Sequence, residues 1–419
     1  MPDAKIMYLC YFGLRESLVQ TQVLPYLREI NKLDRVRISL LTFEPDLKRK
    51  WTTEEIEAEK KKLSEEGIAW HFLPYHKRPS APATLYDVLA GARLIRKLIR
   101  REGIDLLHAR VHVPALMGAI ARKFLSKKPK LLFDVRGFFP EEYTDAGIWK
   151  ENGWLYRSVK RVEKWLLKDS DGFVVLTEKA RSILFPESKE TGFDLRGRPV
   201  EVIPCCVDFK RFESADRSAR AGMRRRLGVE DRFVIVYVGS FGGWYLTEEM
   251  TDFLRTAREK NPRTFALVLT QSPPQQVAEL LRKRGFTDRD FFIDKVPPSE
   301  VPDYLSASDA SLSLIKACYS KQSSSPTKIA EYLVCGLPIV SNSGVGDLDD
   351  LIEGEKVGVI INEFNRSEYA RAFDRIVRMS GAEDFREHSR QIAGKMFDLE
   401  TVGGARYQRI YRTLLKRND

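Results

Sequence analysis

The 419-residue chain has little cysteine, and its cysteines form no recognisable pattern. There are five, an odd number, with no C-x-x-C pair and no Cys/His cluster at metal-ligand spacing. A disulfide framework or a zinc site is therefore not expected. The adjacent pair Cys205-Cys206 follows an apolar run, and we interpret it as packing rather than as a redox pair.

Long apolar runs are also lacking. Runs such as 233–238 and 265–269 are far shorter than the ~20 residues that a helix needs to cross a bilayer. The first residues, MPDAKIMYLCYFG, contain no basic segment followed by an apolar one, so we expect a buried strand there and not a signal peptide. On these grounds we expect a cytoplasmic protein.

What is present is a globular composition, with 43% apolar and 31% charged residues, and enough length for two or three domains. Short apolar runs alternate with amphipathic stretches, which is typical of βα units around a parallel sheet. The sequence thus predicts an α/β protein with two Rossmann-like, doubly wound domains. Strands are expected at 6–11, 36–43, 68–73, 104–108, 130–135, 172–176 and 200–203, and then at 234–238, 266–270, 291–294, 310–314, 338–341 and 357–361.

The domain boundary is expected just after Pro204, because a charged segment without strand character follows and a new βα series opens at Phe233. We assign 1–207 to an N-terminal acceptor-binding domain and 208–399 to a C-terminal nucleotide-sugar-binding domain. Residues 400–419 are expected to form a helix that packs back on the N-terminal domain.

The net charge of +11 is concentrated in one part of the chain. Residues 71–130 hold 13 basic and 3 acidic side chains, a surplus of +10. Such a stretch attracts anions, although a solvated helix face explains it equally well. One helix here is well marked: arginine and lysine occupy one face, Gly103 ends it, and the apolar face holds Val88, Leu89, Ala92, Ile95, Leu98 and Ile99.

The segment most informative about chemistry is SSSPTKIAEYLVCGLPIVSNSGVGD, residues 323–347. Small hydroxylated residues precede a predicted helix at 327–335, and the N–H groups and positive dipole end of such a helix suit a diphosphate. Lys328 adds a cation, and Glu331 offers a carboxylate for the ribose hydroxyls of a nucleotide. Taken singly, each residue is also explained as a plain cap or a solvated helix position. The donor-binding candidates on this segment are Ser323, Ser325, Pro326, Thr327, Lys328 and Glu331.

This segment resembles the donor-binding motif of retaining glycosyltransferase family 4, whose members have the GT-B fold. Four more segments match that family in order: IDLLHARVHVPALMG at 104–118, DSDGFVVL at 169–176, VIPCCVDFKRF at 202–212 and VYVGS at 236–240. The resemblance implies two Rossmann-like domains that face each other across a cleft holding the active site.

The chain also departs from the family pattern. The first Glu of the family's E-x7-E pair is Ser323 here, and residues 241–246, FGGWYL, stand where a basic pair is usual. The FDVRGFFPEE loop at 133–142 has Arg136 where many members have His. A branch of the family with this Arg-Gly-Phe-x-Pro-Glu loop also carries a segment like LVQTQVLPYL, found here at 18–27. The chain resembles that branch.

The resemblance implies transfer of a sugar from a UDP- or GDP-sugar with retention of configuration, with the leaving phosphate itself deprotonating the acceptor. Arg136 is then the catalytic cation, with Lys321 and Lys328 as further candidates to neutralise the diphosphate. Ser240 and Gly13 are expected near the donor, although Gly13 is equally explained as a turn residue. No metal and no cofactor are expected.

The acceptor is expected to be an anionic glycan or a lipid-linked molecule that docks on the basic N-terminal domain. Helix 154–168, WLYRSVKRVEKWLLK, fits peripheral contact with the inner face of a membrane, and fits a crossover helix packed on the sheet equally well. Isolated His108 and His112 are read first as structural groups. Three alternatives remain open: an epimerase, a catalytically silent relative and, least favoured, a nucleic-acid-binding protein.

Overall fold

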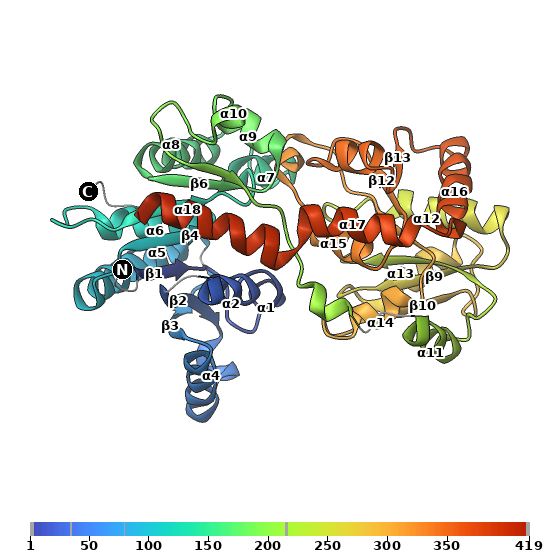
Figure 1. Ribbon diagram of the computed structural model, residues 1–419, viewed down its shortest axis with the longest axis horizontal. Coiled ribbons are helices and arrows are strands. Elements are labelled where there is room, and N and C mark those ends of the chain that lie inside the picture. The colour runs from blue at the N-terminus through green and yellow to red at the C-terminus, as the bar shows by residue number, and fades with distance from the viewer. Residues whose placement is uncertain (1–3, 34–35, 79, 214–216, 416–419) are drawn as a thin grey trace. The chain divides into compact units, whose positions relative to one another are not determined.

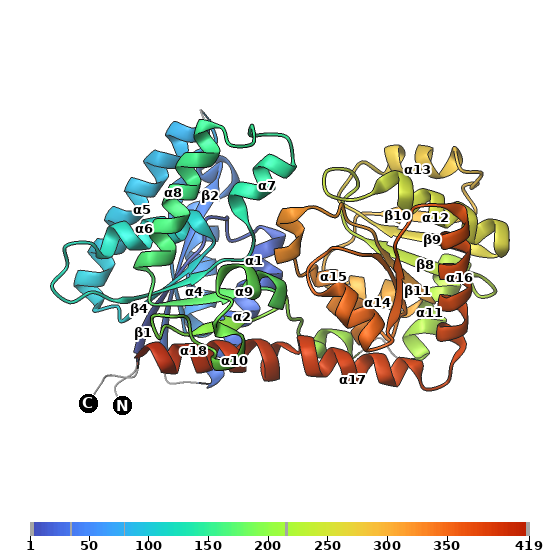
Figure 2. The ribbon, with the colours of Figure 1, turned by 90° about the horizontal axis from the view of Figure 1, so that it is seen from above.

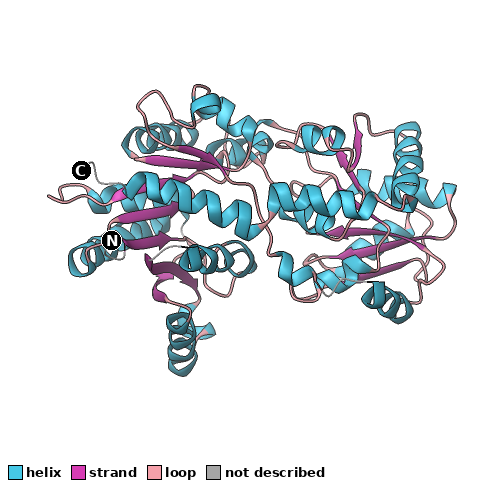
Figure 3. Ribbon diagram, viewed as in Figure 1, coloured by secondary structure: helices cyan, strands magenta, loops and turns pink. Residues whose placement is uncertain are grey.

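A computed structural model describes residues 4–33, 36–78, 80–213 and 217–415 (Figure 1). The chain divides into two compact units. Unit 1 comprises Met1–Pro204 together with Leu399–Asp419, and unit 2 comprises Cys205–Asp398. Each unit is an α/β domain built on one sheet (Figure 3).

Unit 1 contains a seven-stranded sheet in the order β3-β2-β1-β4-β5-β6-β7. All neighbouring strands pair in parallel. The order reverses direction beside β1, which is the doubly wound arrangement that the alternating sequence pattern predicts. The strands are β1 Ala4–Leu9, β2 Val36–Pro45, β3 Ile68–Tyr75, β4 Leu106–Arg110, β5 Lys130–Asp134, β6 Gly172–Val175 and β7 Val200–Val202.

Helices cover both faces of this sheet. Because successive side chains of a strand point to opposite faces, alternate residues of each strand contact different helical layers. Met7 and Leu9 of β1 belong to the core under α5, α6 and α8, whereas Tyr8 points to the opposite face and lies against His108. The opposite face is covered by α2 and α18 (Figure 2). The helices are α1 Ser17–Gln22, α2 Leu24–Leu33, α3 Leu47–Lys50, α4 Thr53–Glu65, α5 Ser80–Glu102, α6 His112–Arg122, α7 Phe139–Asp145, α8 Trp154–Asp169, α9 Glu178–Leu184, α10 Ser188–Thr191, η4 Leu399–Gly404 and α18 Ala405–Leu415.

Unit 2 contains a six-stranded parallel sheet in the order β10-β9-β8-β11-β12-β13. Its strands are buried on both faces and are therefore short, continuous apolar runs. All thirteen expected strands, seven in unit 1 and six in unit 2, are present. The strands of unit 2 are β8 Phe233–Val238, β9 Thr264–Leu269, β10 Phe291–Asp294, β11 Ala310–Ser313, β12 Ile339–Asn342 and β13 Gly358–Ile361.

Two helical layers enclose the sheet of unit 2. Ile235 and Val268 face the layer of α12, α13 and α16, whereas Val234 and Leu267 face α14, α15 and α17. The helical segments are η1 Phe209–Phe212, α11 Arg217–Leu227, α12 Thr247–Lys260, α13 Pro274–Arg282, α14 Val301–Ser306, η2 Tyr319–Ser323, α15 Thr327–Val334, η3 Asp350–Gly354, α16 Arg366–Gly381 and α17 Phe385–Phe397.

The structure corrects one position in the best-marked helix of the sequence. Gly103 ends α5 in the left-handed region (φ 69°), as expected, and Val88, Ala92, Ile95, Leu98 and Ile99 are buried. Leu89, however, is 55% exposed. The prediction of a buried Leu89 is wrong because α6 and the sheet cover a narrower stripe of α5 than its apolar residues span. Within the described ranges, no helix is long and apolar enough to cross a bilayer.

Candidate functional site

The predicted donor segment lies at the carboxyl edge of the unit 2 sheet. α15 begins at Thr327 after Pro326, whose backbone is extended. The Tyr332 hydroxyl in α15 accepts a hydrogen bond of 2.8 Å from the Val238 N–H, which ties the helix to the last residue of β8. The first turn of α15 thereby meets the loop that follows β8, at the edge where open parallel sheets bind ligands.

Lys328 is the central cation of this site. Its side chain is buried, and its Nζ lies 4.3 Å from the centroid of the Tyr237 ring and 4.4 Å from that of Tyr245. No described residue forms a hydrogen bond with this Nζ. Burial lowers the pKa of Lys328 to about 7, against the opposing effect of Glu331. A buried ammonium group that lies against aromatic faces and has no hydrogen-bond partner among the described residues is poised to bind an anion.

Glu331 lies one turn further along α15. Burial raises the pKa of its carboxyl group to about 7, although Arg211 and Lys328 act in the opposite direction. Its carboxyl oxygens can accept hydrogen bonds from the hydroxyls of a ligand, which suits the ribose role that the sequence predicts.

The loop after β8 approaches Lys328 closely at Gly239. Its φ is 144°, and a Cβ placed there would lie 2.7 Å from Lys328 Nζ. A glycine is therefore required for the lysine to occupy its position. Ser240 follows, exposed to solvent, and its carbonyl accepts a 2.6 Å hydrogen bond from the Tyr237 hydroxyl.

The serines of the segment have different environments. Ser323 is buried, and its hydroxyl donates to the Ser320 carbonyl at 2.7 Å. The Ser325 hydroxyl accepts a 3.1 Å hydrogen bond from the Cys205 N–H, which joins the start of unit 2 to the donor segment. Thr327 is half-buried at the first position of α15, where helical N–H groups have no partner within the helix.

Lys321 is the second cation near α15, in η2. Its side chain is buried and its Nζ lies 4.0 Å from the centroid of the Trp244 ring. Trp244 and Tyr245 thus pair with Lys321 and Lys328, at the positions where the family usually has its basic pair. In this chain η2 and α15 supply the cations, and the loop after β8 supplies aromatic rings in place of a basic pair. No single segment of the sequence indicates this arrangement.

Arg136 is in unit 1, in the loop after β5. Its φ of 52° is left-handed, which is unusual for a residue with a side chain and is typical of functional loops. The side chain is 4% exposed, and its Nε lies 3.8 Å from Asp134 Oδ1. Burial alone would raise the pKa of the Asp134 carboxyl, but Arg136 and His108 outweigh it and hold the pKa below its usual range.

Asp134 is held in turn by α18. The Tyr407 hydroxyl donates to Asp134 Oδ2 at 2.8 Å, and His108 Nε2 lies 3.3 Å from the same oxygen. His108 Nδ1 contacts the Tyr411 hydroxyl at 2.5 Å. His108 is therefore a buried structural group whose pKa is lowered by burial, and α18 supports the loop that carries Arg136.

Gly13 is in the loop after β1. Its N–H donates to Glu16 Oε1 at 3.0 Å, and a Cβ at this position would lie 2.7 Å from Pro45 Cδ. The close packing of β2 against this loop explains the glycine without a ligand. Its expected role near the donor stays a prediction.

A polar cluster that the sequence did not indicate lies at the same edge of the unit 1 sheet. Asp87, 1% exposed, accepts hydrogen bonds from the Tyr11 hydroxyl (2.7 Å) and the His76 N–H (3.0 Å), and its other oxygen lies 2.6 Å from His76 Nδ1. The sequence feature that could have indicated this cluster is Asp87, an aspartate on the apolar face of a predicted helix. His112 forms a similar buried pair with Glu163 at 2.9 Å.

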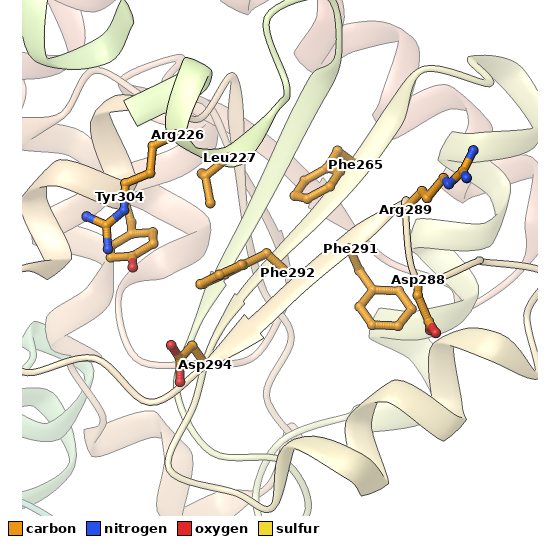
Figure 4. A pocket seen from close by; sticks show the side chains of 9 residues that line it. All are labelled: Arg226, Leu227, Phe265, Asp288, Arg289, Phe291, Phe292, Asp294 and Tyr304. Atoms are coloured by element: carbon orange, nitrogen blue, oxygen red, sulfur yellow. The ribbon is translucent and has the colours of Figure 1, made fainter. Parts of the chain in front are cut away.

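A surface cavity of about 330 Å³ lies elsewhere on unit 2, beside the edge strand β10 (Figure 4). Phe292, Tyr304 and Arg226 line one end of it, and Phe291 and Asp288 line the other. It contains none of the predicted donor residues. In the part of the chain that the structure describes, no group of three or more His, Cys, Asp or Glu side chains is arranged to hold a metal ion.

Comparison with known families matches both units. Residues 50–211 match the family model described as Glycosyltransferase Family 4, and residues 220–395 match the model described as Glycosyl transferases group 1. Two curated relatives come from Streptomyces kanamyceticus. A 2-deoxystreptamine glucosyltransferase is 26% identical over 52% of this chain and 54% of its own length, and an alpha-D-kanosaminyltransferase is 23% identical over 63% and 61%. The chain thus spans between half and two thirds of these relatives.

Solved structures share the fold over the whole chain. A glycosyltransferase from Rickettsia africae superposes with a TM-score of 0.70 at 16% identity, with both chains covered completely. Anabaena HepE, solved in complex with UDP and glucose, gives a TM-score of 0.69 at 17% identity over 99% of this chain and all of its own. A family-4 model thus matches a segment of the first unit, a group-1 model matches a segment of the second, and the two Rossmann-like domains share the GT-B fold of these solved glycosyltransferases.

Proposed function

We propose that the protein transfers a sugar from a nucleotide-sugar donor to a glycan or lipid-linked acceptor, with retention of configuration. The observation that carries the proposal is Lys328, a buried cation at the start of α15 whose Nζ has no hydrogen-bond partner among the described residues. The diphosphate of a nucleotide-sugar supplies the missing anion at a helix N-terminus, where backbone N–H groups also point outward.

The proposed mechanism depends on stabilising the leaving nucleoside diphosphate. Breaking the sugar–phosphate bond places negative charge on the diphosphate, and preformed donors directed at that charge lower the barrier by several kcal/mol. Lys328 and the first N–H groups of α15 supply such donors in unit 2, Glu331 accepts the ribose hydroxyls, and Arg136 of unit 1 is assigned to the same leaving group. The departing phosphate takes the acceptor proton, so no separate carboxylate base, metal or cofactor enters the proposal.

The donor site is tested by thermal unfolding with UDP, GDP, ADP and CMP and with their sugar conjugates. A UDP-sugar is the first candidate, since the structural neighbour HepE is solved with UDP. Ligand at 100 times its Kd stabilises a protein by about 2.7 kcal/mol. We expect one nucleotide to stabilise the wild type, and Glu331→Ala and Lys328→Met to lose that shift.

Glu383→Ala is a matched control for Glu331→Ala, because Glu383 is an exposed carboxylate of the same unit. It is expected to keep the full shift. If no nucleotide stabilises the wild type, or if the site variants respond as the control does, the donor assignment is wrong. Retention itself is read from the anomeric configuration of the product by NMR.

A catalytically silent relative is the second candidate, favoured by Ser323. This residue replaces the first Glu of the family pattern, and its hydroxyl is directed to the Ser320 carbonyl rather than outward. Nucleotide binding without sugar transfer, and without slow hydrolysis of the donor, identifies this case. Product formation by the wild type eliminates it.

The proposed acceptor follows from the charge of unit 1. An anionic glycan or a phosphate-bearing lipid complements the surplus of +10 in residues 71–130, and we place the enzyme in the cytoplasm, peripheral to the inner face of the membrane. No nucleic acid is proposed as a partner. Vesicles and soluble anionic glycans are compared as acceptor carriers in the transfer assay.

A further inference from the structure

The outer side of α8 is a regular stripe of cations that begins with a tryptophan. Its exposed residues recur every three or four positions, which places them on one line along the helix. Trp154 at the N-terminal end is 74% exposed. The exposed residues of the stripe are Trp154, Arg157, Arg161, Lys164 and Lys168.

α5 repeats this arrangement on the same face of the unit 1 sheet. Its N-terminal half exposes three large apolar side chains, Leu85 (60%), Tyr86 (61%) and Leu89 (55%). Its C-terminal half exposes Arg93, Lys97 and Arg100 in line with them. α6 contacts both helices, so the two stripes belong to one layer (Figure 2).

Both apolar ends lie at the same edge of the unit. α5 and α8 each connect two parallel strands, so both run antiparallel to the sheet and both begin at its carboxyl edge. Ile148, 67% exposed, precedes α8 at this edge. The polar cluster of His76 also lies there, with the His76 ring 5.0 Å from Tyr86. The apolar ends and this polar cluster therefore share one edge.

Few carboxylates neutralise this surface. Asp87 and Glu163 are buried, and Asp169 is paired with Arg122. None of the described residues forms an ion pair with the exposed cations of either stripe. Lys160 of α8, which is half-buried and lies outside the stripe, is by contrast paired with Glu141 and Glu163. Glu151 is the exposed carboxylate in the segment that leads into α8.

A surface cavity of about 310 Å³ lies along the α8 stripe. It is lined by Tyr156, Arg157, Lys160, Arg161 and Lys164. Four arginine or lysine side chains around a concave surface, of which Lys160 is paired with carboxylates, fit a phosphate group.

We propose that the α5/α8 face, defined by the two stripes and Ile148, docks unit 1 on an anionic lipid bilayer. The apolar ends enter the boundary between headgroups and acyl chains, and the cations behind them contact lipid phosphates. A bilayer fits better than a soluble anion because exposed tryptophan, leucine and isoleucine side chains accompany the charge. The proposal deepens the peripheral membrane placement proposed above by naming the surface that docks, and it does not rest on sugar transfer.

Co-sedimentation with vesicles tests the charged part of the face. The full-length protein is mixed with neutral phosphatidylcholine vesicles and with vesicles that contain 30% phosphatidylglycerol, at low and high salt. We expect binding to the anionic vesicles alone, and loss of that binding at high salt. The triple variant Arg157→Glu, Arg161→Glu, Lys164→Glu is expected to bind at least about 100-fold more weakly, since each cation near such a surface contributes measurably.

The matched control carries the same charge change on unit 2. Arg375, Arg378 and Lys283 are exposed there, and the described residues form no ion pair with them. Their triple replacement by Glu is expected to bind vesicles to within a few-fold of the wild type. An equal loss of vesicle binding in both triple variants indicates a nonspecific effect of net charge and overturns the proposal. Absence of binding between the wild-type protein and anionic vesicles overturns it as well.

Quenching by brominated lipids tests the apolar part. Tryptophan fluorescence of the wild type is expected to fall on binding vesicles that contain brominated acyl chains, and Trp154→Phe is expected to lose most of that quenching. Binding without Trp154-dependent quenching contradicts insertion of the apolar ends. Loss of dextran sulfate binding in the α8 triple variant, with vesicle binding unchanged, assigns the stripe to a soluble polyanion and overturns the proposal.

A nucleotide-induced thermal shift that is unchanged in the α8 triple variant shows that unit 2 remains folded. Circular dichroism and the unfolding midpoint of that variant establish the same for unit 1. Failure of the donor-site tests leaves the vesicle result intact, so the two proposals are decided separately.

Discussion

Replacement of Lys328 by methionine is expected to stabilise the free protein while abolishing nucleotide binding. The side chain keeps its length and its contact with the Tyr237 and Tyr245 rings, but it no longer holds a charge away from water. The proposed anion gains affinity at this site because the unliganded protein leaves the ammonium group poorly solvated.

The magnitude follows from the depressed pKa of Lys328. The fall of this pKa from its ordinary value of 10.5 to about 7 corresponds to a destabilisation of the folded protein of at most about 5 kcal/mol when the group is charged in both states. The folded state releases the proton first as the pH rises. Stability of unit 2 therefore increases between pH 7 and pH 10.5, and the cost is fully present below pH 7.

The assay is calorimetric unfolding of the wild type and Lys328→Met at pH 6, 7, 8 and 9, with the unit 2 transition identified in the wild type by its response to nucleotide. We expect the variant to be more stable at pH 7, and the gap to narrow by about 2 kcal/mol by pH 9. Glu331 adds the opposite slope below pH 7, because burial raises its pKa from 4.5 to about 7 and its ionisation opposes folding over that interval. A gap that is independent of pH between 7 and 9 refutes the assignment of a buried, unpaired lysine.

Three further substitutions test other parts of the structure. Gly239→Ala introduces a Cβ 2.7 Å from Lys328 Nζ at a φ of 144°, so we expect nucleotide affinity, measured by calorimetric titration, to fall at least tenfold. Gly358→Ala places a Cβ 2.1 Å from a backbone carbonyl of β12 and is expected to destabilise unit 2 by about 3 kcal/mol or more in denaturant unfolding. Tyr407→Phe removes the 2.8 Å hydrogen bond to Asp134 and is expected to cost about 1–3 kcal/mol in the thermal unfolding of unit 1.

Matched glycine substitutions control the first two. Gly222→Ala and Gly354→Ala introduce a Cβ with nothing within 4 Å, and neither glycine has a positive φ, so both are expected to leave affinity and stability nearly unchanged. Nucleotide affinity that survives Gly239→Ala contradicts the close approach of the loop to Lys328. A Tyr407→Phe protein as stable as the wild type shows that α18 does not support Asp134.

The strands were the most predictable part of the fold. Each strand is a short apolar run bounded by turns or charged helices. A run of this kind is stable in water only when both of its faces are buried, as they are in a parallel sheet covered by helices. Helix α4 was predictable too, because Thr52 and Glu55 form the capping box that its sequence contains. Leu89 was not, because the width of the buried stripe of α5 depends on how α6 lies against it.

The donor segment shows where prediction from local sequence ends. Its helix start and the positions of Lys328 and Glu331 follow from Ser, Thr and Pro preceding an apolar run, a local property of the chain. The aromatic faces beneath Lys321 and Lys328 come from β8 and the loop after it, some eighty to ninety residues earlier, and the order of the strands in the sheet brings them alongside α15.

The sequence by itself determined the α/β class, the thirteen strands and the residue types of the donor segment, since these depend on periodicity and on neighbours along the chain. Only the tertiary structure decided that Lys328 is buried with no hydrogen-bond partner among the described residues, and that His76, Asp87 and Tyr11 meet at one sheet edge. Burial and the solvation of a charge are properties of packing between distant segments, and no local pattern specifies which segments those are.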